Sequence, residues 1–93
     1  MNGIERITKE RQRQINEENF TAEYDDNFHA GELAILASAY ALSGKLRTAL
    51  FPKNVCMGFN ILKPSPDNRI RELEKAGALI AAEIDRLLRL EDI

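Results

Sequence analysis

The stretch SPDNRIRELEKAGALIAAEIDRLLRL, residues 65–90, decides the fold class of this chain. Its aliphatic residues recur at spacings of three and four, which is the period of an amphipathic α-helix. Ser65 is a favourable N-cap, Pro66 suits the first helical position, and Asp67 faces the positive end of the helix dipole. The stretch therefore predicts a long helix over residues 66–90.

This helix carries apolar residues on two sides. The wider stripe consists of Ile70, Leu73, Gly77, Ile80, Ala81, Ile84, Leu87 and Leu88, and the second strip of Ala78, Leu79, Ala82 and Leu90. A helix with two apolar strips needs two packing partners, and in a chain of 93 residues one of them can be another copy of the chain. We therefore expect a homo-oligomer.

Two further helices are expected toward the N-terminus. Residues 4–18 have a narrow apolar stripe, whereas residues 29–43 are apolar nearly all round, as in a buried helix. Residues 19–29 have neither period, and we expect an ordered loop there that is held by Phe20, Tyr24 and Phe28. Asp25 or Asp26 could cap the second helix, and Gly44 would end it in the left-handed conformation.

Residues 45–64 form the least regular stretch, with at most a short helical turn over 45–50. The prediction is an all-α fold, a small bundle of three main helices (about 4–18, 29–43 and 66–90) with an irregular 45–64 segment, in one domain over residues 1–93. The expected core consists of Leu33, Leu36, Ala37, Tyr40, Leu73, Gly77, Ile80 and Ile84. Gly77 would permit the buried helix to approach closely.

Composition excludes several classes of protein. The 13 basic and 15 acidic residues leave no basic surplus for binding duplex nucleic acid. There is no apolar run long enough to span a membrane, and the polar N-terminus is not a signal peptide. The single cysteine, Cys56, excludes an intrachain disulfide framework. We expect a cytoplasmic protein without a catalytic motif.

Cationic side chains stand at positions that a helical bundle does not favour. Arg11 interrupts the first apolar stripe, and others gather around the start of the last helix, where exposed backbone N–H groups can hold a phosphate. These cations predict a pocket for an anionic ligand, lined by Arg11, Lys63, Arg69, Arg71 and Lys75. The alternative is internal salt bridges to Asp25, Asp26 or Glu32.

A second candidate site is acidic. Carboxylates with one imidazole suit Mg²⁺ or Mn²⁺, and a glutamate of the last helix could complete such a site across the bundle. The candidate ligands are Asp25, Asp26, His29, Glu32 and Glu83. The alternative is that these acids only cap a helix and offset its dipole.

The order of motifs resembles a family of small phage and prophage proteins. That family has the motifs E-R-x-R-Q-I, E-H-D-D, G-E-L-A, K-P and K-A-G-A-L-I-x-A-E-I-x-R-L. The corresponding stretches here are 10–15, 23–26, 31–34, 63–64 and 75–87. Two departures are Tyr24 in place of the family's histidine and a 51–62 loop without tryptophan. The resemblance implies phage origin and a setting in the host cytosol.

Three functions remain open on these observations. The first is a non-enzymatic oligomer that sequesters a phosphate-bearing small molecule, such as a cyclic nucleotide or an ADP-ribose-type defence signal. The second is an inhibitor that covers the surface of a host protein, for which a two-sided last helix is also suited. The third is a MazG-like nucleotide pyrophosphohydrolase that would use the acidic set and Mg²⁺, although the chain lacks a clean ExxE and ExxD pair.

Overall fold

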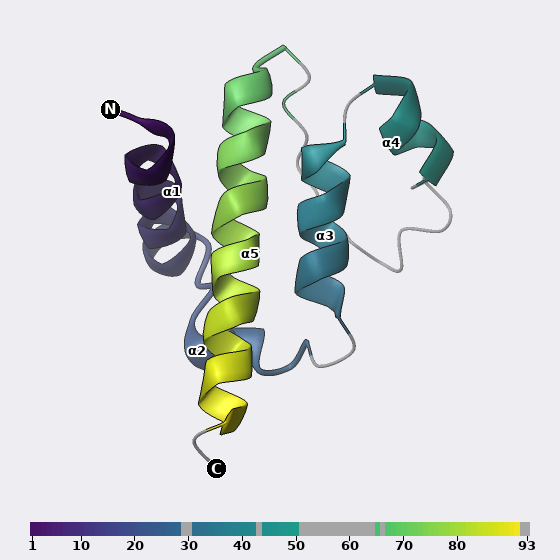
Figure 1. The fold of residues 1–93 in the computed structure, drawn as a ribbon. Coiled ribbons are helices and arrows are strands. Elements are labelled where there is room, and N and C mark those ends of the chain that lie inside the picture. Colours follow the sequence, from purple (N-terminus) through teal and green to yellow (C-terminus); the bar gives the residue numbers. More distant parts are fainter. Residues whose placement is uncertain (29–30, 43, 51–64, 66, 92–93) are drawn as a thin grey trace.

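The computed structural model describes residues 1–28, 31–42, 44–50, 65 and 67–91, and all regular structure among them is helical (Figure 1). The elements in chain order are α1 (Gly3–Glu17), α2 (Ala22–Asp25), α3 (Glu32–Ala41), α4 (Gly44–Leu50) and α5 (Arg69–Glu91). The predicted all-α bundle is therefore confirmed, with two short helices in addition to the three main ones.

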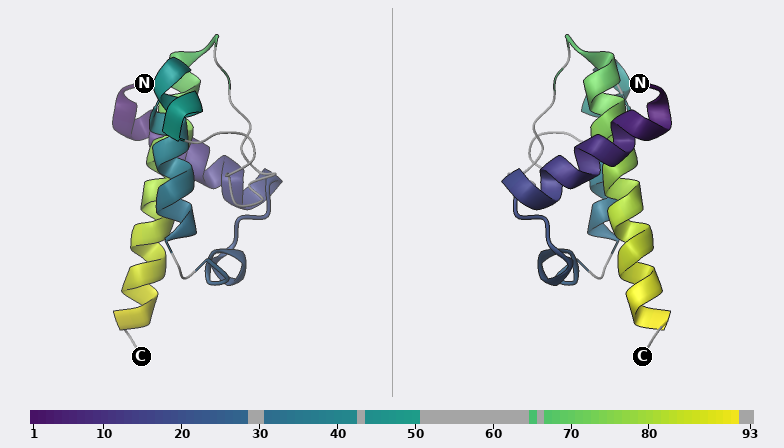
Figure 2. Two further views of the ribbon diagram at one scale, coloured as in Figure 1. Left: turned by 90° about the vertical axis from the view of Figure 1, so that its right-hand side faces the viewer. Right: turned by 90° about the vertical axis from the view of Figure 1, so that its left-hand side faces the viewer.

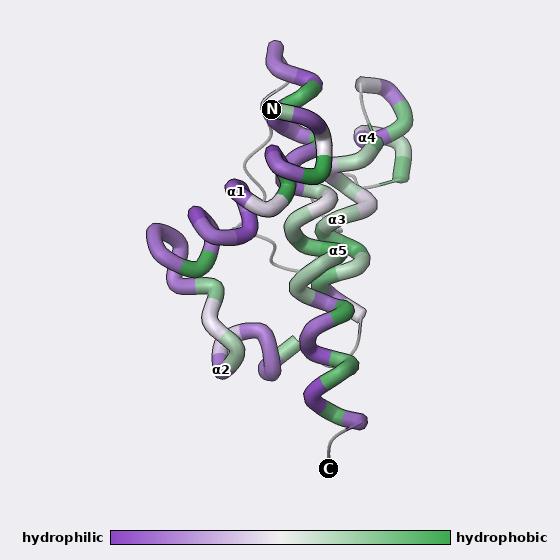
Figure 3. The backbone as a smooth tube through the Cα atoms, turned by 60° about the vertical axis from the view of Figure 1, so that its left-hand side comes forward, coloured by the Kyte–Doolittle hydropathy of each residue, from purple (hydrophilic) through white to green (hydrophobic). Residues whose placement is uncertain are grey.

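Helix α5 is the centre of the arrangement, with α1 on one side and α3 on the other (Figure 1). Helix α3 runs alongside α5, whereas α1 crosses it obliquely, and the one-turn α2 lies near the end of α1 (Figure 2). Helix α1 is largely hydrophilic along its length, and α3 is largely hydrophobic (Figure 3). The two flanking helices therefore contact α5 through different chemistry.

The buried core lies between α3 and α5. Leu33, Leu36, Ala37 and Tyr40 of α3 pack with Phe20 against a face of α5 that consists of Leu79 between two small residues, Ala76 and Ala82. The four predicted core residues of α3 are confirmed. Leu73, Ile80 and Ile84 of α5 are exposed, so their predicted burial is wrong. Alanine side chains let two helices approach closely, and α5 therefore turns its alanine face toward α3 and leaves its larger aliphatic residues outside.

Most of the apolar stripe predicted for the first helix is also on the outside, apart from the half-buried Ile7, which lies beside Gly77 of α5. Ile4 and Ile15 are exposed, and the buried residues of α1 are the polar Glu10 and Gln14. The helix begins with a capping box, in which the Asn2 side chain accepts from the Glu5 N–H at 2.9 Å and the Glu5 carboxylate accepts from the Asn2 N–H at 3.0 Å.

The loop after α1 contains the short α2, which Thr21 caps by accepting from the Tyr24 N–H. The aromatic residues hold this loop as predicted, since the rings of Phe20 and Tyr24 stack at 5.0 Å and Phe28 meets Tyr24 edge-on at 5.1 Å. Asp25 and Asp26 end α2 and do not cap α3. Gly31, with a φ of 85°, precedes α3 instead.

Helix α5 begins at Arg69, three residues later than predicted, because Asn68 and not Ser65 caps it. The Asn68 side chain accepts from the Arg71 N–H at 3.1 Å. The Ser65 carbonyl accepts from the Asn68 N–H at 2.8 Å, so residue 65 belongs to the preceding turn. The predicted Ser65 cap is therefore corrected.

Residues 44–50 form α4, although the sequence predicts an irregular segment with at most one helical turn there. Gly44 has the left-handed backbone that was predicted for it, with a φ of 55°. The side chain of Arg47 donates to the Ala39 carbonyl at 2.7 Å and thereby ties α4 to the end of α3. Residues 51–64, the rest of the predicted irregular segment, lie outside the described part of the chain.

Gly77 does provide a close approach, but to α1 and not to the buried helix α3. A Cβ atom at this position would lie 2.6 Å from Cδ1 and 2.8 Å from Cγ1 of Ile7. The oblique crossing of α1 over α5 therefore depends on the absence of a side chain here.

Candidate functional site

Arg11 of the predicted anion pocket is engaged in an internal ion pair. It donates to Oδ2 of Asp25 at 2.9 Å and to the Phe20 carbonyl at 3.4 Å. The Asp25 side chain is fully buried. Burial raises the pKa of Asp25 although Arg11 opposes that shift. This pair is one of the internal salt bridges that the sequence left open as an alternative.

The other described cations of this set lie at two different places. Arg69 donates to the Tyr40 and Leu42 carbonyls at 3.1 and 3.2 Å and contacts the Ala41 carbonyl, which caps the end of α3. The buried Glu72 neutralises it at 3.3 Å. Hydrogen bonding from Arg47 holds the pKa of Glu72 below its ordinary range.

Arg71 and Lys75 lie beside the buried Glu10, between α1 and α5. Arg71 pairs with Glu10 at 2.6 Å and with Glu74 at 3.2 Å. Burial raises the pKa of Glu10, but hydrogen bonds from Arg13 and Arg71 outweigh it, so this pKa lies below its ordinary value. Burial lowers the pKa of Lys75, whose ammonium lies 5.5 Å from the centre of the Tyr40 ring. Lys63 lies outside the described residues.

A groove of about 650 Å³ runs along α1 where α1 meets the start of α5. Its cationic lining consists of Arg6, Lys9, Arg13 and Arg71, and its acidic lining of Glu10, Glu17 and Glu74. Only Arg71 was among the predicted ligand-binding residues. The other three were missed, although their spacing of three and four along α1 places them on one helix face. The volume falls within the range of small-molecule sites.

The acidic candidates are also paired with arginines. Asp26 accepts from Arg89 at 2.7 Å, and Glu83 accepts from Arg86 at 2.6 Å. The charges of Asp26 and Glu32 also act on Arg86, which places these acids at one end of the bundle. Within the described ranges, no three histidine, cysteine, aspartate or glutamate side chains gather as a metal site would require. His29 lies outside those ranges.

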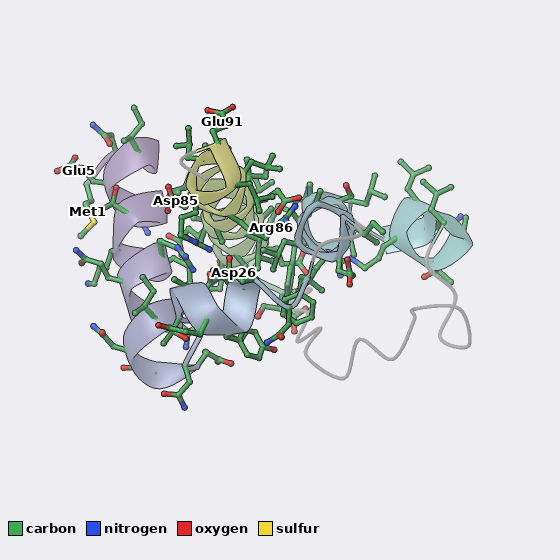
Figure 4. All side chains as sticks on the ribbon, turned by 90° about the horizontal axis from the view of Figure 1, so that it is seen from below. Met1, Glu5, Asp26, Asp85, Arg86 and Glu91 are labelled. Carbon is green, nitrogen blue, oxygen red and sulfur yellow. The ribbon has the colours of Figure 1, made fainter. Side chains whose placement is uncertain are left out.

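Among the described residues, the largest group of exposed aliphatic side chains on one helix side comprises six residues of α5, which we call the α5 apolar face. It consists of Ile70, Leu73, Ile80, Ile84, Leu87 and Leu88, each between 46 and 59% exposed. Viewed from below, Arg86 points toward α3 and Asp85 toward α1, whereas Glu91 points away from both (Figure 4). Glu91 is four residues after Leu87 and seven after Ile84, so the C-terminal half of the α5 apolar face also points away from both flanking helices. Its N-terminal residues, Ile70 and Leu73, line a pocket with residues of α1.

Compared with protein-family models, curated proteins and solved structures, the chain matches none. Among the described helices, none is both long and apolar enough to cross a bilayer.

Proposed function

We propose that the chain is a non-enzymatic protein-interaction module that binds through the α5 apolar face. One observation carries the proposal: six large aliphatic side chains, each about half exposed, lie on the same side of one helix. Their exposed parts add up to apolar surface on the order of 500 Å², which is at the upper end of the patches found on ordinary monomers.

The distribution of charge supports the same proposal. The chain buries Glu10, Gln14, Asp25, Glu72 and Arg86 while it exposes the α5 apolar face. Burying ion pairs is often no better for stability than burying hydrophobic residues of similar size. Close packing accounts for the alanine face that α5 turns toward α3, but it leaves the α5 apolar face uncovered, and a protein surface bound there would bury it.

The test is affinity capture with matched variants. A tagged chain is expressed with an untagged copy in a bacterial host, which the resemblance to phage proteins makes the relevant lysate. We expect at least one protein, either a host protein or the untagged chain, to elute with the wild type. Ile84→Asp should lose it, and Leu46→Asp, which alters an exposed leucine on α4, should keep it. Identical eluates from wild type and Ile84→Asp would contradict the proposal, provided that circular dichroism shows equal helicity.

The groove beside α1 supports a second candidate function, the binding of a small molecule. Lys9 and three arginines line a volume large enough for a nucleotide-sized ligand. The arginines pair with Glu10 or Glu74 of the same groove, so a phosphate-bearing small molecule would bind by sharing or displacing these pairs. Calorimetry with cyclic dinucleotides and cyclic ADP-ribose isomers tests this candidate. Lys9→Glu should weaken any binding at least tenfold, whereas Lys45→Glu on α4 should not change it. Absence of binding across the panel at micromolar concentration would exclude these ligands.

A further inference from the structure

The C-terminal end of α5 extends beyond the ends of α1 and α3, as two directions of view show (Figure 1 and Figure 2). The last two turns of α5 carry Ile84, Leu87 and Leu88, each about half exposed. A protruding helix with apolar side chains at these spacings can insert its apolar side into a complementary surface. A partner can therefore reach this part of the α5 apolar face without displacing α1 or α3.

Two exposed carboxylates border the same part of the α5 apolar face. Glu91 follows Leu87 by four residues, and Asp85 precedes Leu88 by three, so each lies beside an apolar residue of the face. Neither carboxylate forms an ion pair with any residue that the structure describes. The negative end of the α5 dipole adds to their charge. This end of the face is therefore both apolar and acidic.

The arginines of these turns are engaged within the chain. Arg86 pairs with Glu83 at 2.6 Å and points toward α3 (Figure 4). Arg89 pairs with Asp26 at 2.7 Å, and the charge of Asp85 acts on Arg89 only as a weaker, additional attraction. The carboxylates at the border of the face are therefore left for cations of another molecule.

We propose that the α5 apolar face binds a cationic amphipathic helix of a partner protein, with Asp85 and Glu91 opposite lysine or arginine residues of that helix. This inference rests on the proposed function, since it assumes that the face binds protein, and it specifies the chemistry of the partner. A helix fits because side chains spaced by three and four form ridges that pack between those of another helix. Opposite charges at the border of such a contact contribute specificity and speed association.

The N-terminal end of the face provides a place for a bulky apolar side chain of the partner. An apolar pocket of about 200 Å³ lies there, and Ile70 and Leu73 line it together with Gly3 and Ile7 of α1. Large side chains that fill such pockets contribute much of the binding energy of an interface. Leu73 and Glu91 are 18 residues apart, or about 27 Å along a helix, so a partner helix of about five turns reaches both ends.

Two synthetic peptides of about 20 residues test the inference. Both are helical with leucine at spacings of three and four, and they carry either lysine or glutamate at the other positions. In calorimetry at low salt, the lysine peptide should bind the wild type at least tenfold more tightly than the glutamate peptide, and added salt should reduce this preference. Ile84→Ser, which removes an apolar contact without changing the charge, should weaken binding of the lysine peptide.

Charge reversal tests the role of the carboxylates. Glu91→Lys should reduce the preference for the lysine peptide at least threefold, and Asp85→Lys/Glu91→Lys should abolish it. Glu23→Lys is the matched control, since Glu23 is an exposed carboxylate on α2, which lies on the other side of α5 from Glu91 (Figure 4). A preference that survives in Asp85→Lys/Glu91→Lys, or that Glu23→Lys reduces equally, would overturn the assignment of these carboxylates.

Equal affinity of the wild type for the two peptides, or no binding of the lysine peptide, would overturn the inference. If capture of a host protein still depended on Ile84, the proposed function would stand and only the charge of the partner would be wrong. Light scattering tests the other occupant. A wild type with twice the 10.5 kDa of one chain, reduced to one chain by Ile84→Ser, would assign the face to a second copy and overturn the cationic partner.

Discussion

At the level of single residues, Arg11 and Asp25 form the most deeply buried ion pair among the described residues. Arg11→Met would leave the fully buried carboxylate without its cation. Removing one partner of a buried pair costs about 3–5 kcal/mol, so we expect a loss of this size in the free energy of unfolding at pH 7. Urea unfolding measures it.

The pH dependence of this variant has a definite sign. Burial already raises the pKa of Asp25, and loss of Arg11 would raise it further. The folded state then binds the proton more tightly than the unfolded state, so stability falls as pH rises through the folded-state pKa. The deficit of Arg11→Met should therefore shrink between pH 7 and pH 5. The double variant Arg11→Met/Asp25→Asn should show no such trend, and an equal deficit at both pH values would refute the argument.

Gly77 is the second residue with a specific structural requirement. A leucine there would collide with Ile7, because even a Cβ atom would lie 2.6 Å from its Cδ1. Overpacking of this kind costs about 1–3 kcal/mol, so Gly77→Leu should lower the melting temperature, as measured by circular dichroism. Ile7→Ala should recover part of the loss in the double variant. A near-wild-type melting temperature for Gly77→Leu alone would show that α1 does not approach α5 here.

At the level of elements, the sequence predicts which segments are helical better than it predicts which side of a helix is buried. The long helix, the apolar α3 and the helical N-terminus follow from periodicity and capping residues. Periodicity does not predict which side of α5 faces α3, because α5 has two apolar strips and both have helical spacing. Close packing between α3 and α5 decides between them, and it favours Ala78 and Ala82 over Ile80 and Ile84.

This orientation of α5 predicts that the substitution of alanine by leucine is destabilising at one alanine and nearly neutral at another. Ala82 is fully buried, whereas Ala34 is on the exposed side of α3. Ala82→Leu should therefore force α3 and α5 apart and cost about 1–3 kcal/mol, while Ala34→Leu should change the free energy of unfolding by less than about 0.5 kcal/mol. Thermal unfolding of both variants checks this. Equal stability would mean that the other face of α5 packs against α3.

At the level of the whole molecule, the sequence predicts the charged residues of the candidate sites better than it predicts how they are paired. The sequence indicates separate acidic and cationic clusters, and the fold brings Arg11 to Asp25 and Arg89 to Asp26. The spacing of residues along the chain does not predict which partners form these two ion pairs, because each pair joins residues from different helices. The groove beside α1 was missed for the same reason, since it forms only where α1 crosses α5.

If the protein that covers the α5 apolar face is a second copy of the chain, the thermal stability must depend on concentration. Dissociation accompanies unfolding, so mass action favours the folded dimer as concentration rises. A tenfold increase adds about 1.4 kcal/mol per dimer, which corresponds to a rise of a few degrees in the melting temperature of a chain of this size. Scanning calorimetry of wild type over two decades of concentration should show this rise. Ile80→Asp should melt at one temperature throughout, because a second copy covering this face would bury the carboxylate without a partner. A wild-type midpoint that does not move with concentration would contradict the coupling of folding to pairing of the α5 apolar face.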